Sequence, residues 1–535
     1  MFGRPAIAAH SATLALNKPS DPTAPRRLDK QRFEAGQQCH KRLWLDCHAP
    51  VQEPASASRL ELSRVGDELR NLARTAFPKG ITVEADDVDA AAEETAARLK
   101  EAAPVLFDAV FVSEGAVARC DILVVHKDKQ VDLFEIKSGT KVKHRYVNDL
   151  ALQAATLAEN GYKVQRAYLL HINPKYDHTR GEPYPPMQLL RSSDVTAKVA
   201  KQQANVERKL QNLRAVIDRE EAPAQPMGTH CRSPFACPHV QGCTATTTGL
   251  PLTRLPELTR LQEQELRKDG IAGMLDVPPD REGLTFRQRR TLQSHADSAR
   301  IVEPFLGEEL QECERPLHFL AAVSITDPLP RLDHQRPWQR TPYGWAVQTV
   351  HEDGRIERQS FVQVDRDDPR PGFVKSLARH LEMGGTALVW GDECLRELRP
   401  LLDSIPDEKA SLRALLGRDH LDLRALLQSS VFDPEMHDSH DLAAVCATLL
   451  DDDSGRGIEA LNPEVRFELV HKARAPRVRA TTKEKIGGII TEALEWQVER
   501  LFTLYETFAS AAAPPPEEAD DTQDPGADPS ALGPR

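Results

Sequence analysis

Several things are missing from this sequence, and each absence narrows its class. Its 535 residues contain no apolar run of about 18 residues, the length that a transmembrane helix needs. The N-terminal stretch lacks the apolar core of a secretory signal. Nine cysteines are ordinary usage, and without an export signal a cluster of them is better interpreted as metal or iron–sulfur ligands than as disulfides. We therefore expect a cytoplasmic protein without a membrane partner.

Two further absences concern nucleic acid and nucleotides. The 69 Lys and Arg residues are outnumbered by 81 Asp and Glu residues, which leaves a formal charge of −12. This excess of acid argues against a protein held to nucleic acid by bulk charge, although it permits a local basic groove. No G-x-x-x-x-G-K-[ST] motif occurs, so nothing indicates an ATP-driven motor within the chain.

The chain divides into parts of different composition. Length alone predicts roughly three or four domains. Both ends are polar and rich in Pro, which predicts disorder, and Gly and Pro punctuation at 248–256 separates two large blocks. We expect a disordered leader, a first folded block, a helical linker region, a second folded block and a disordered acidic tail, in that order: 1–27, 28–248, 249–314, 315–510 and 511–535.

A hairpin in the first block carries charged side chains in an unusual arrangement. Residues 116–137 read AVARCDILVVHKDKQVDLFEIK, in which a β-branched run and an alternating run flank a polar turn. Because side chains alternate across a strand, Glu135 and Lys137 share a face, and Asp121 begins the partner strand. Two carboxylates are the hard ligands that Mg²⁺ or Mn²⁺ prefers, and a lysine beside them stabilises charge on a phosphoryl group. The arrangement is typical of a metal-dependent nuclease, in which the metal activates water.

The helix expected after this hairpin adds a fourth candidate. The stretch RYVNDLALQAATLAENG is helical in pattern and ends at Asn160-Gly161. Gln153 interrupts its apolar run, and its amide is placed to reach back towards the metal or the substrate. A Glu-x-Lys on a strand is more often a solvated cross-strand pair, and an Asp often begins a strand, so the hypothesis depends on the combination.

A second group of candidate ligands lies in the loop HCRSPFACPHVQGC. Cys231, Cys237 and Cys243 have the spacing C-x5-C-x5-C, which indicates thiolate ligation. Cys39, far upstream, is the candidate for the fourth ligand and would staple the two ends of the first block together. Four thiolates suit a [4Fe–4S] cluster or Zn²⁺, and the usual zinc spacing is tighter, which favours iron–sulfur. Three competing ligands lie nearby: His230, His239 and Cys47.

In their order along the chain, these residues resemble the iron–sulfur branch of the PD-(D/E)XK nucleases, which includes CRISPR-associated RecB-like exonucleases and the nuclease domains of AddB-type recombination subunits. The opening LDKQRFEAGQQCHKRLWL and the cysteine loop look like those of an uncharacterised bacterial family in that branch. The resemblance implies an α/β fold with a restriction-endonuclease-like PD-(D/E)XK core over 28–248. It also implies a [4Fe–4S] cluster on the four cysteines and a Mg²⁺ or Mn²⁺ site formed by Asp121, Glu135 and Lys137.

Two positions of the first block match that family less well. Gln153 matches the family's helix glutamine, but the aromatic residue often found four positions later is Leu157 here. An upstream helix of the family carries a Gly and then a His or an acidic residue. In the corresponding stretch, RVGDELRNLARTAFPKG, Glu68 is the nearest equivalent and becomes a candidate third metal ligand.

The resemblance continues into the second block, where family members carry a DEDD-type, RNase H-like domain. Its first motif is an Asp-x-Glu at the end of a strand. The corresponding stretch here is HFLAAVS, so Ala321 and Val323 stand where the carboxylates would be, although HLDL keeps Asp422. A two-metal site cannot be built without its first two carboxylates. We therefore predict a degenerate RNase H-like α/β domain over 315–510, without catalysis, that serves nucleic-acid or partner binding.

Together these expectations describe a DNA nuclease that hydrolyses phosphodiester bonds, by resemblance an exonuclease on single-stranded DNA or DNA ends. Repair, recombination or defence would be its setting, alongside a helicase or defence-system partner. An excess of Lys and Arg between 137 and 175 is typical of a loop that follows a phosphate backbone, although a solvated loop explains it equally well. Two alternatives stay open: a catalytically silent nucleic-acid-binding or scaffold protein on a nuclease fold, and a zinc-stapled regulator.

Overall fold

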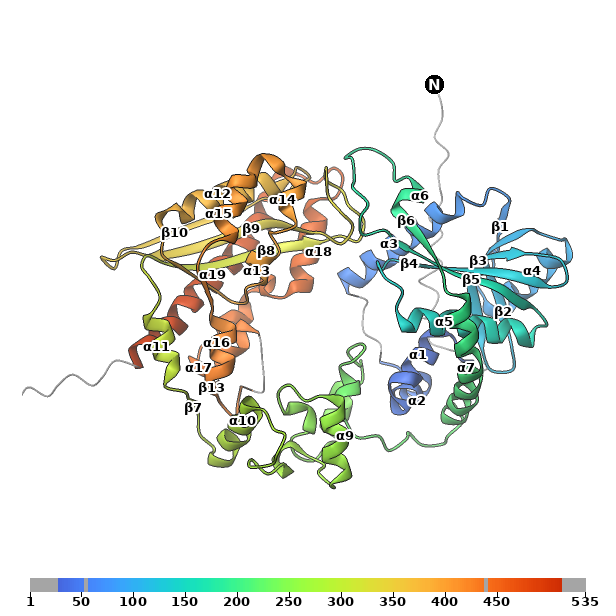
Figure 1. Cartoon of the computed structure of the whole chain (residues 1–535), viewed down its shortest axis with the longest axis horizontal. Helices are drawn as coiled ribbons and strands as arrows, with labels where there is room; N and C mark the ends of the chain where they lie inside the picture. Colours follow the sequence, from blue (N-terminus) through green and yellow to red (C-terminus); the bar gives the residue numbers. More distant parts are fainter. Residues whose placement is uncertain (1–26, 52–55, 437–440, 512–535) are drawn as a thin grey trace, which may run out of the picture.

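The computed structural model describes residues 27–51, 56–436 and 441–511. The predicted leader and acidic tail therefore lie outside the described residues, apart from one residue of each. The described chain is a mixed α/β protein with one large sheet in each block and a helical segment between the blocks (Figure 1). Within these ranges no helix is long and apolar enough to cross a membrane.

The sheet of the first block has six strands that stand side by side in chain order. Strands β2, β3 and β4 form an antiparallel meander, and β4 pairs in parallel with β5. At the two edges, β1 pairs in parallel with β2, and β6 pairs antiparallel with β5. The strands are β1 (Gly80–Thr82), β2 (Val105–Val112), β3 (Val117–Val125), β4 (Gln130–Lys137), β5 (Lys163–Ile172) and β6 (Leu190–Asp194). The predicted hairpin is confirmed as β3–β4.

Helices cover both faces of this sheet. Helix α5 (His144–Glu159) connects the parallel strands β4 and β5, and its buried Leu150 and Leu157 belong to a core shared with α7 (Thr196–Ile217). Such a crossover helix is what a parallel pair of strands requires. Two short helices, α1 (Lys30–Gln38) and α2 (His40–His48), pack on the same side, whereas α3 (Ala57–Arg74) belongs to a second core on the other face.

The second block contains a five-stranded sheet between two layers of helices. The first three strands form an antiparallel meander, and the last two are added in parallel beside β8, which gives the order β10-β9-β8-β11-β12. The strands are β8 (Leu317–Thr326), β9 (Arg340–Val350), β10 (Ile356–Val362), β11 (Thr386–Val389) and β12 (His420–Asp422). Helix α19 (Ala480–Ala511) packs on one face of the sheet, and α12 (Pro369–His380) packs on the other.

The two blocks are connected in two ways. The linker region, with α9 (Arg260–Lys268) and α10 (Phe286–Asp297), has a small core of its own. The blocks also touch directly through α3 and α18 (Pro463–Ala473) and through the loop 327–339 (Figure 1). In that loop Trp338 Nε1 donates a hydrogen bond of 2.7 Å to the backbone oxygen of Ser138, the residue after Lys137. The second block therefore reaches the predicted nuclease site.

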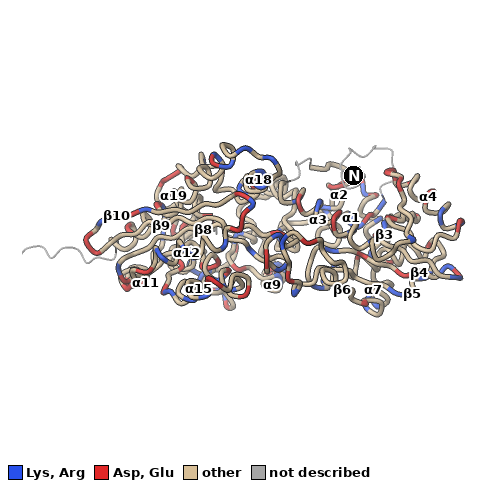
Figure 2. Tube along the Cα trace, turned by 90° about the horizontal axis from the view of Figure 1, so that it is seen from above, with Lys and Arg blue, Asp and Glu red and all other residues tan. Residues whose placement is uncertain are grey.

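Charges of both signs are interspersed along the whole length of the molecule (Figure 2). This distribution agrees with the acidic formal charge.

Separate cores predict separate unfolding. Leu133 is fully buried in the first sheet and Leu388 in the second. Leu133→Ala should destabilise the first block by about 2–5 kcal/mol, because it leaves a cavity in a packed core. Calorimetry should show that Leu133→Ala and the matched Leu388→Ala lower different unfolding transitions. If both variants lowered one shared transition equally, the two sheets would form a single cooperative unit.

Candidate functional site

Glu135 is a buried carboxylate, 4% exposed, that is held by side chains from three different elements. Lys137 Nζ, on the same strand, donates to Oε1 at 2.6 Å, and Lys30 Nζ, from α1, donates to the same oxygen at 2.8 Å. Gln153 Nε2, from α5, donates to Oε2 at 2.8 Å. The first helix, the fourth strand and the crossover helix therefore converge on one charge.

Asp149 completes a closed ring of alternating charges. Its Oδ2 lies 3.2 Å from Lys30 Nζ and 3.0 Å from Lys137 Nζ, so each lysine contacts both carboxylates. Asp149 precedes Gln153 by one helical turn and therefore shares its helix face. This spacing is a sequence signal that could have identified Asp149 as part of the site. Lys30 had no such signal, because 105 residues separate it from Glu135.

The ring stabilises the ionised forms of Glu135 and Lys30 against the desolvation that burial imposes on them. Burial by itself would raise the pKa of Glu135, but the ammonium groups of Lys137 and Lys30 hold that pKa well below its usual range. Burial by itself would lower the pKa of Lys30, but the carboxylates of Glu135 and Asp149 raise it well above its usual value. Both groups are therefore ionised at neutral pH.

Asp121 lies beside this ring and is less well compensated. Its Oδ2 accepts a hydrogen bond of 2.7 Å from the backbone N–H of Ile136, at the point where the β3–β4 pairing ends. Burial and the neighbouring charge of Glu135 raise the pKa of Asp121 to about 6, and Arg70 of α3 offsets this only in part. A carboxyl group in this situation would gain from a cation beside it.

Asp121 and Glu135 are the residues of this group that fit a hard divalent cation. Gln153 Oε1 is buried next to them without a hydrogen-bond partner and adds an oxygen of the kind such an ion or its water accepts. Lys30 contacts Glu135 through a side chain that is 41% exposed, so it can withdraw towards solvent in exchange for an ion. The donor set therefore suits Mg²⁺ or Mn²⁺.

Four of the five residues predicted for the metal and catalytic site, Asp121, Glu135, Lys137 and Gln153, come together in this group. Glu68 is placed differently: its carboxylate lies 3.0 Å from Arg64 on the same helix, with a side chain that is 40% exposed. The α3 residue whose charge acts on Asp121 is Arg70. Among the described residues, no hydrogen bond or ion pair joins Glu68 to Asp121 or Glu135. Its role as a ligand stays a prediction.

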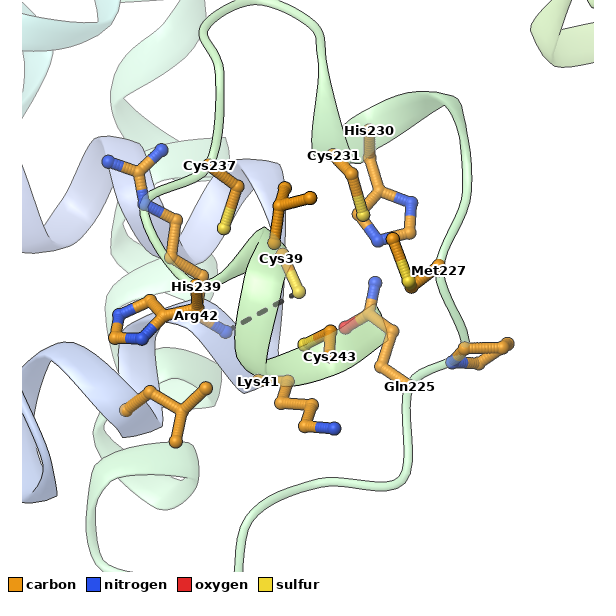
Figure 3. A pocket seen from close by; sticks show the side chains of 13 residues that line it. Cys39, Lys41, Arg42, Gln225, Met227, His230, Cys231, Cys237, His239 and Cys243 are labelled. Atoms are coloured by element: carbon orange, nitrogen blue, oxygen red, sulfur yellow. Dashed lines mark hydrogen bonds between the residues drawn. The ribbon is translucent and has the colours of Figure 1, made fainter. Parts of the chain in front are cut away.

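The four predicted cysteine ligands line one small cavity (Figure 3). Cys39 caps the N-terminus of α2, where its Sγ accepts a hydrogen bond of 3.4 Å from the backbone of Arg42. Cys231, Cys237 and Cys243 approach it from the later loop and from the short helix α8 (Val240–Ala245). Burial raises the pKa of the Cys39, Cys231 and Cys237 thiols, and each also responds to the charge of another cysteine of the set.

Four thiols around one cavity could hold a zinc ion or a [4Fe–4S] cluster. A tetrahedral zinc ion with bonds of about 2.3 Å would hold its sulfurs about 3.8 Å apart. In the part of the chain that the structure describes, no three of these sulfurs lie within 4.8 Å of one another. A [4Fe–4S] cluster binds each thiolate through a different iron and therefore accepts a wider set.

Two of the three competing ligands also line the cavity. His230 faces it, and burial lowers the pKa of that imidazole. His239 also lines the cavity, but its Nε2 lies 2.7 Å from Asp46 Oδ1, which orients the ring towards that carboxylate. The third, Cys47, is buried in the apolar core and is not among the residues that line the cavity. His230 therefore stays an alternative ligand beside the four predicted cysteines.

A separate group of potential ligands lies where the two blocks touch. Single atoms of Glu61, Asp327 and His471 lie within 4.8 Å of one another, and Asp327 Oδ1 is 3.5 Å from His471 Nε2. Arg64 and Arg331 contact Glu61 at 2.6 Å and 2.8 Å, and the charge of Asp327 acts on Arg474. These arginines already balance the carboxylates, so we interpret the group as an ion network of the contact.

Two of the three positions of the second sheet that were named from the sequence carry apolar side chains. Ala321 and Val323 lie on β8 and are buried in the core beneath α19. Asp422 caps helix α16 (Leu423–Ser430), accepting a hydrogen bond of 3.1 Å from Ala425, and also accepts one of 3.0 Å from the backbone of Gly391. The remaining carboxylate therefore stabilises a helix start and a loop.

Comparison with protein families bears on this second sheet. Residues 320–441 are similar to the family described as Domain of unknown function (DUF2779). The matched segment runs from β8 past α16 and includes neither the Glu135 group nor the cysteine cavity. No curated protein matches the chain.

The raised pKa of Asp121 predicts a pH-dependent stability in metal-free protein. The folded carboxyl group keeps its proton up to about pH 6, whereas the unfolded one keeps it only up to about pH 4. The stability that protonated Asp121 contributes to the fold is therefore fully present below about pH 4 and is lost as the pH rises to about 6. The loss amounts to about 3 kcal/mol. Urea unfolding in EDTA should therefore show that Asp121→Asn gains stability over wild type at pH 8 but gains little below pH 4, where the carboxyl group is protonated in both states. The control is Asp128→Asn, on the exposed hairpin turn. An Asp121→Asn gain that did not change with pH would contradict the assignment.

Proposed function

We propose that this protein is a metal-dependent DNA nuclease of the PD-(D/E)XK type, a hydrolase whose nuclease core carries a [4Fe–4S] cluster. The observation that carries the proposal is that Asp121, Lys137 and Gln153 lie around the buried carboxylate of Glu135. All four residues were selected from sequence pattern and resemblance. Two carboxylates can hold a metal ion that activates water for phosphodiester hydrolysis, and a lysine and an amide beside them can position groups around that ion.

The side chains of the ring have distinct roles in this proposal. Bound Mg²⁺ or Mn²⁺ supplies a Lewis acid and a water of lowered pKa. Asp121 and Glu135 would hold the ion, and Gln153 fixes the orientation of Glu135 through its hydrogen bond. Lys137, restrained between Glu135 and Asp149, would stabilise the charge that develops on the scissile phosphate. Lys30 would have to withdraw from Glu135 to make room for the ion.

The cysteine cavity supports this arrangement from a distance. Helix α1 carries Lys30 at its first turn and Gln38 at its last, and Gln38 Nε2 donates to the backbone oxygens of His230 and Phe235 at 2.6 Å and 2.7 Å. A cluster held by Cys39 and the later loop would close a chain segment of nearly 200 residues and stabilise the placement of α1. We assign it a structural role.

The second block supports a non-catalytic, RNase H-like assignment. Its sheet is a three-stranded meander with two parallel strands added beside the first strand, which agrees with the α/β class predicted for this block. The buried Ala321 and Val323 leave that sheet without the carboxylates of its first motif. Its loop at Trp338 contacts the backbone next to Lys137, so we infer a positioning or partner-binding role for it.

One observation favours the alternative of a catalytically silent nucleic-acid-binding protein. Both oxygens of Glu135 already have partners, Lys30 and Lys137 on one and Gln153 on the other. If these bonds persist in the presence of a divalent ion, the site cannot hold the metal. Activity measurements separate the two functions.

Cleavage of end-labelled DNA tests the proposal. Anaerobically purified wild type with Mg²⁺ or Mn²⁺ should cut single-stranded DNA or DNA ends. Glu135→Gln and Lys137→Ala should each lower the rate at least 100-fold, because they remove a metal ligand and a group that stabilises the transition state. Lys129→Ala, on the turn of the same hairpin, is the matched control and should cut normally. Absence of cutting from a preparation with its cluster intact would support the silent alternative.

Substitution of one cysteine tests the cluster. Cys231→Ala should lose the iron and the broad absorbance near 400 nm, and it should unfold at a lower temperature, because the staple is then open. Cys446→Ala removes an isolated, fully buried thiol of the second block and should retain the iron. A colourless wild type that contains stoichiometric zinc would contradict the cluster.

A further inference from the structure

A line of cations and aromatic rings connects the catalytic group to the cysteine loop. Lys137 Nζ lies 5.2 Å from the centroid of the Tyr146 ring, and the guanidinium of Arg145 lies 5.0 Å from the same centroid. Arg145 also lies 4.7 Å from the centroid of Phe235, a residue of the cysteine loop. The two candidate sites are therefore joined by side chains as well as by backbone.

Phe235 is unusual because its ring is exposed although its backbone is firmly held. The residue is 39% exposed, whereas Tyr146 is 8% exposed and belongs to the core. Gln38 Nε2 donates to the backbone oxygen of Phe235, and the N–H of Cys237 donates to the oxygen of Cys231 at 2.9 Å, which closes the loop around it. A single exposed apolar residue is common on protein surfaces, so the significance of Phe235 depends on the cation beside its ring.

The chemistry around Phe235 indicates the class of that ligand. Arg145 covers part of the ring, and the basic segment that follows Lys137 displays Lys141, Lys143 and His144 to solvent. An exposed ring with cations beside it is the combination by which proteins hold single-stranded nucleic acid, the ring stacking on a base and the cations attracting the phosphates. Bases within a duplex are stacked on one another and do not offer a free face to such a ring.

We propose that Phe235, supported by Arg145, stacks on an unpaired nucleobase and thereby positions a single strand for the Glu135 site. This inference rests on the proposed nuclease function and adds to it a residue that positions the single strand or frayed end. Phe235 acts through the strand that it holds and is a positioning residue. Because Phe235 lies on the cysteine loop, binding of the single strand should depend on the correct folding of that loop.

Binding in EDTA, where no cleavage occurs, isolates this contact. Fluorescence anisotropy with a labelled 20-nucleotide oligothymidine should show that Phe235→Ala weakens binding by about 5- to 150-fold, the range for loss of one stacked base. Phe235→Trp keeps a stacking ring and should bind at least as well as wild type. Phe286→Ala is the matched control, because Phe286 is 47% exposed and lies 5.4 Å from the guanidinium of Arg290 in the linker region. Affinity for a closed-ended duplex should not change.

Iron content and wild-type cleavage are measured on the same preparations, so that each failure has a separate meaning. Equal binding by Phe235→Ala and wild type would overturn the inference and leave the nuclease proposal intact if wild type cuts. If Phe235→Ala loses its iron, the comparison of Phe235→Leu with Phe235→Trp decides. Weaker binding by the leucine variant supports stacking, whereas equal binding overturns it. If wild type neither binds nor cuts any nucleic acid, the proposed function fails as well.

Discussion

An ionised carboxylate can be buried only where opposite charges and hydrogen bonds replace its water, and Glu135 imposes this condition on the first block. Its partners come from α1, β4 and α5, so the helix at the start of the block, the hairpin and the crossover helix must all be in place before the charge is satisfied. Removal of one partner would leave this buried charge with less compensation and would therefore destabilise the first block. The group that we propose for catalysis is therefore also a constraint on folding.

The same helix α1 connects this constraint to the cysteine cavity and, through it, to the basic segment. Gln38 at its end holds the cysteine loop, that loop displays Phe235, and Arg145 joins Phe235 to Tyr146 and Lys137. From the other side, Trp338 of the second block contacts the backbone that follows Lys137. Residues on which the proposed chemistry depends are thus held from both blocks, which gives the second sheet a physical connection to the site.

Much of the site could be predicted because its residues follow local periodicities. Alternation along a hairpin placed Glu135 and Lys137 together, and the apolar pattern of one helix isolated Gln153 and, read one turn earlier, would have isolated Asp149. Lys30 could not be found in this way, since no local period connects it to Glu135 over 105 residues. Helix periodicity also does not fix how α3 is rotated against the sheet. The sequence therefore could not show that the α3 charge acting on Asp121 is that of Arg70. The contact of loop 327–339 with the first block depends on tertiary packing in the same way.

The most direct test of this account is an anomalous difference map from crystals grown with Mn²⁺. It predicts one peak beside the carboxylates of Asp121 and Glu135, with Lys30 withdrawn from Glu135 and Lys137 still bonded to Asp149. A peak at Glu61, Asp327 and His471 instead, or an intact bond from Lys30 to Glu135 with no metal beside it, would contradict the assignment of the catalytic site.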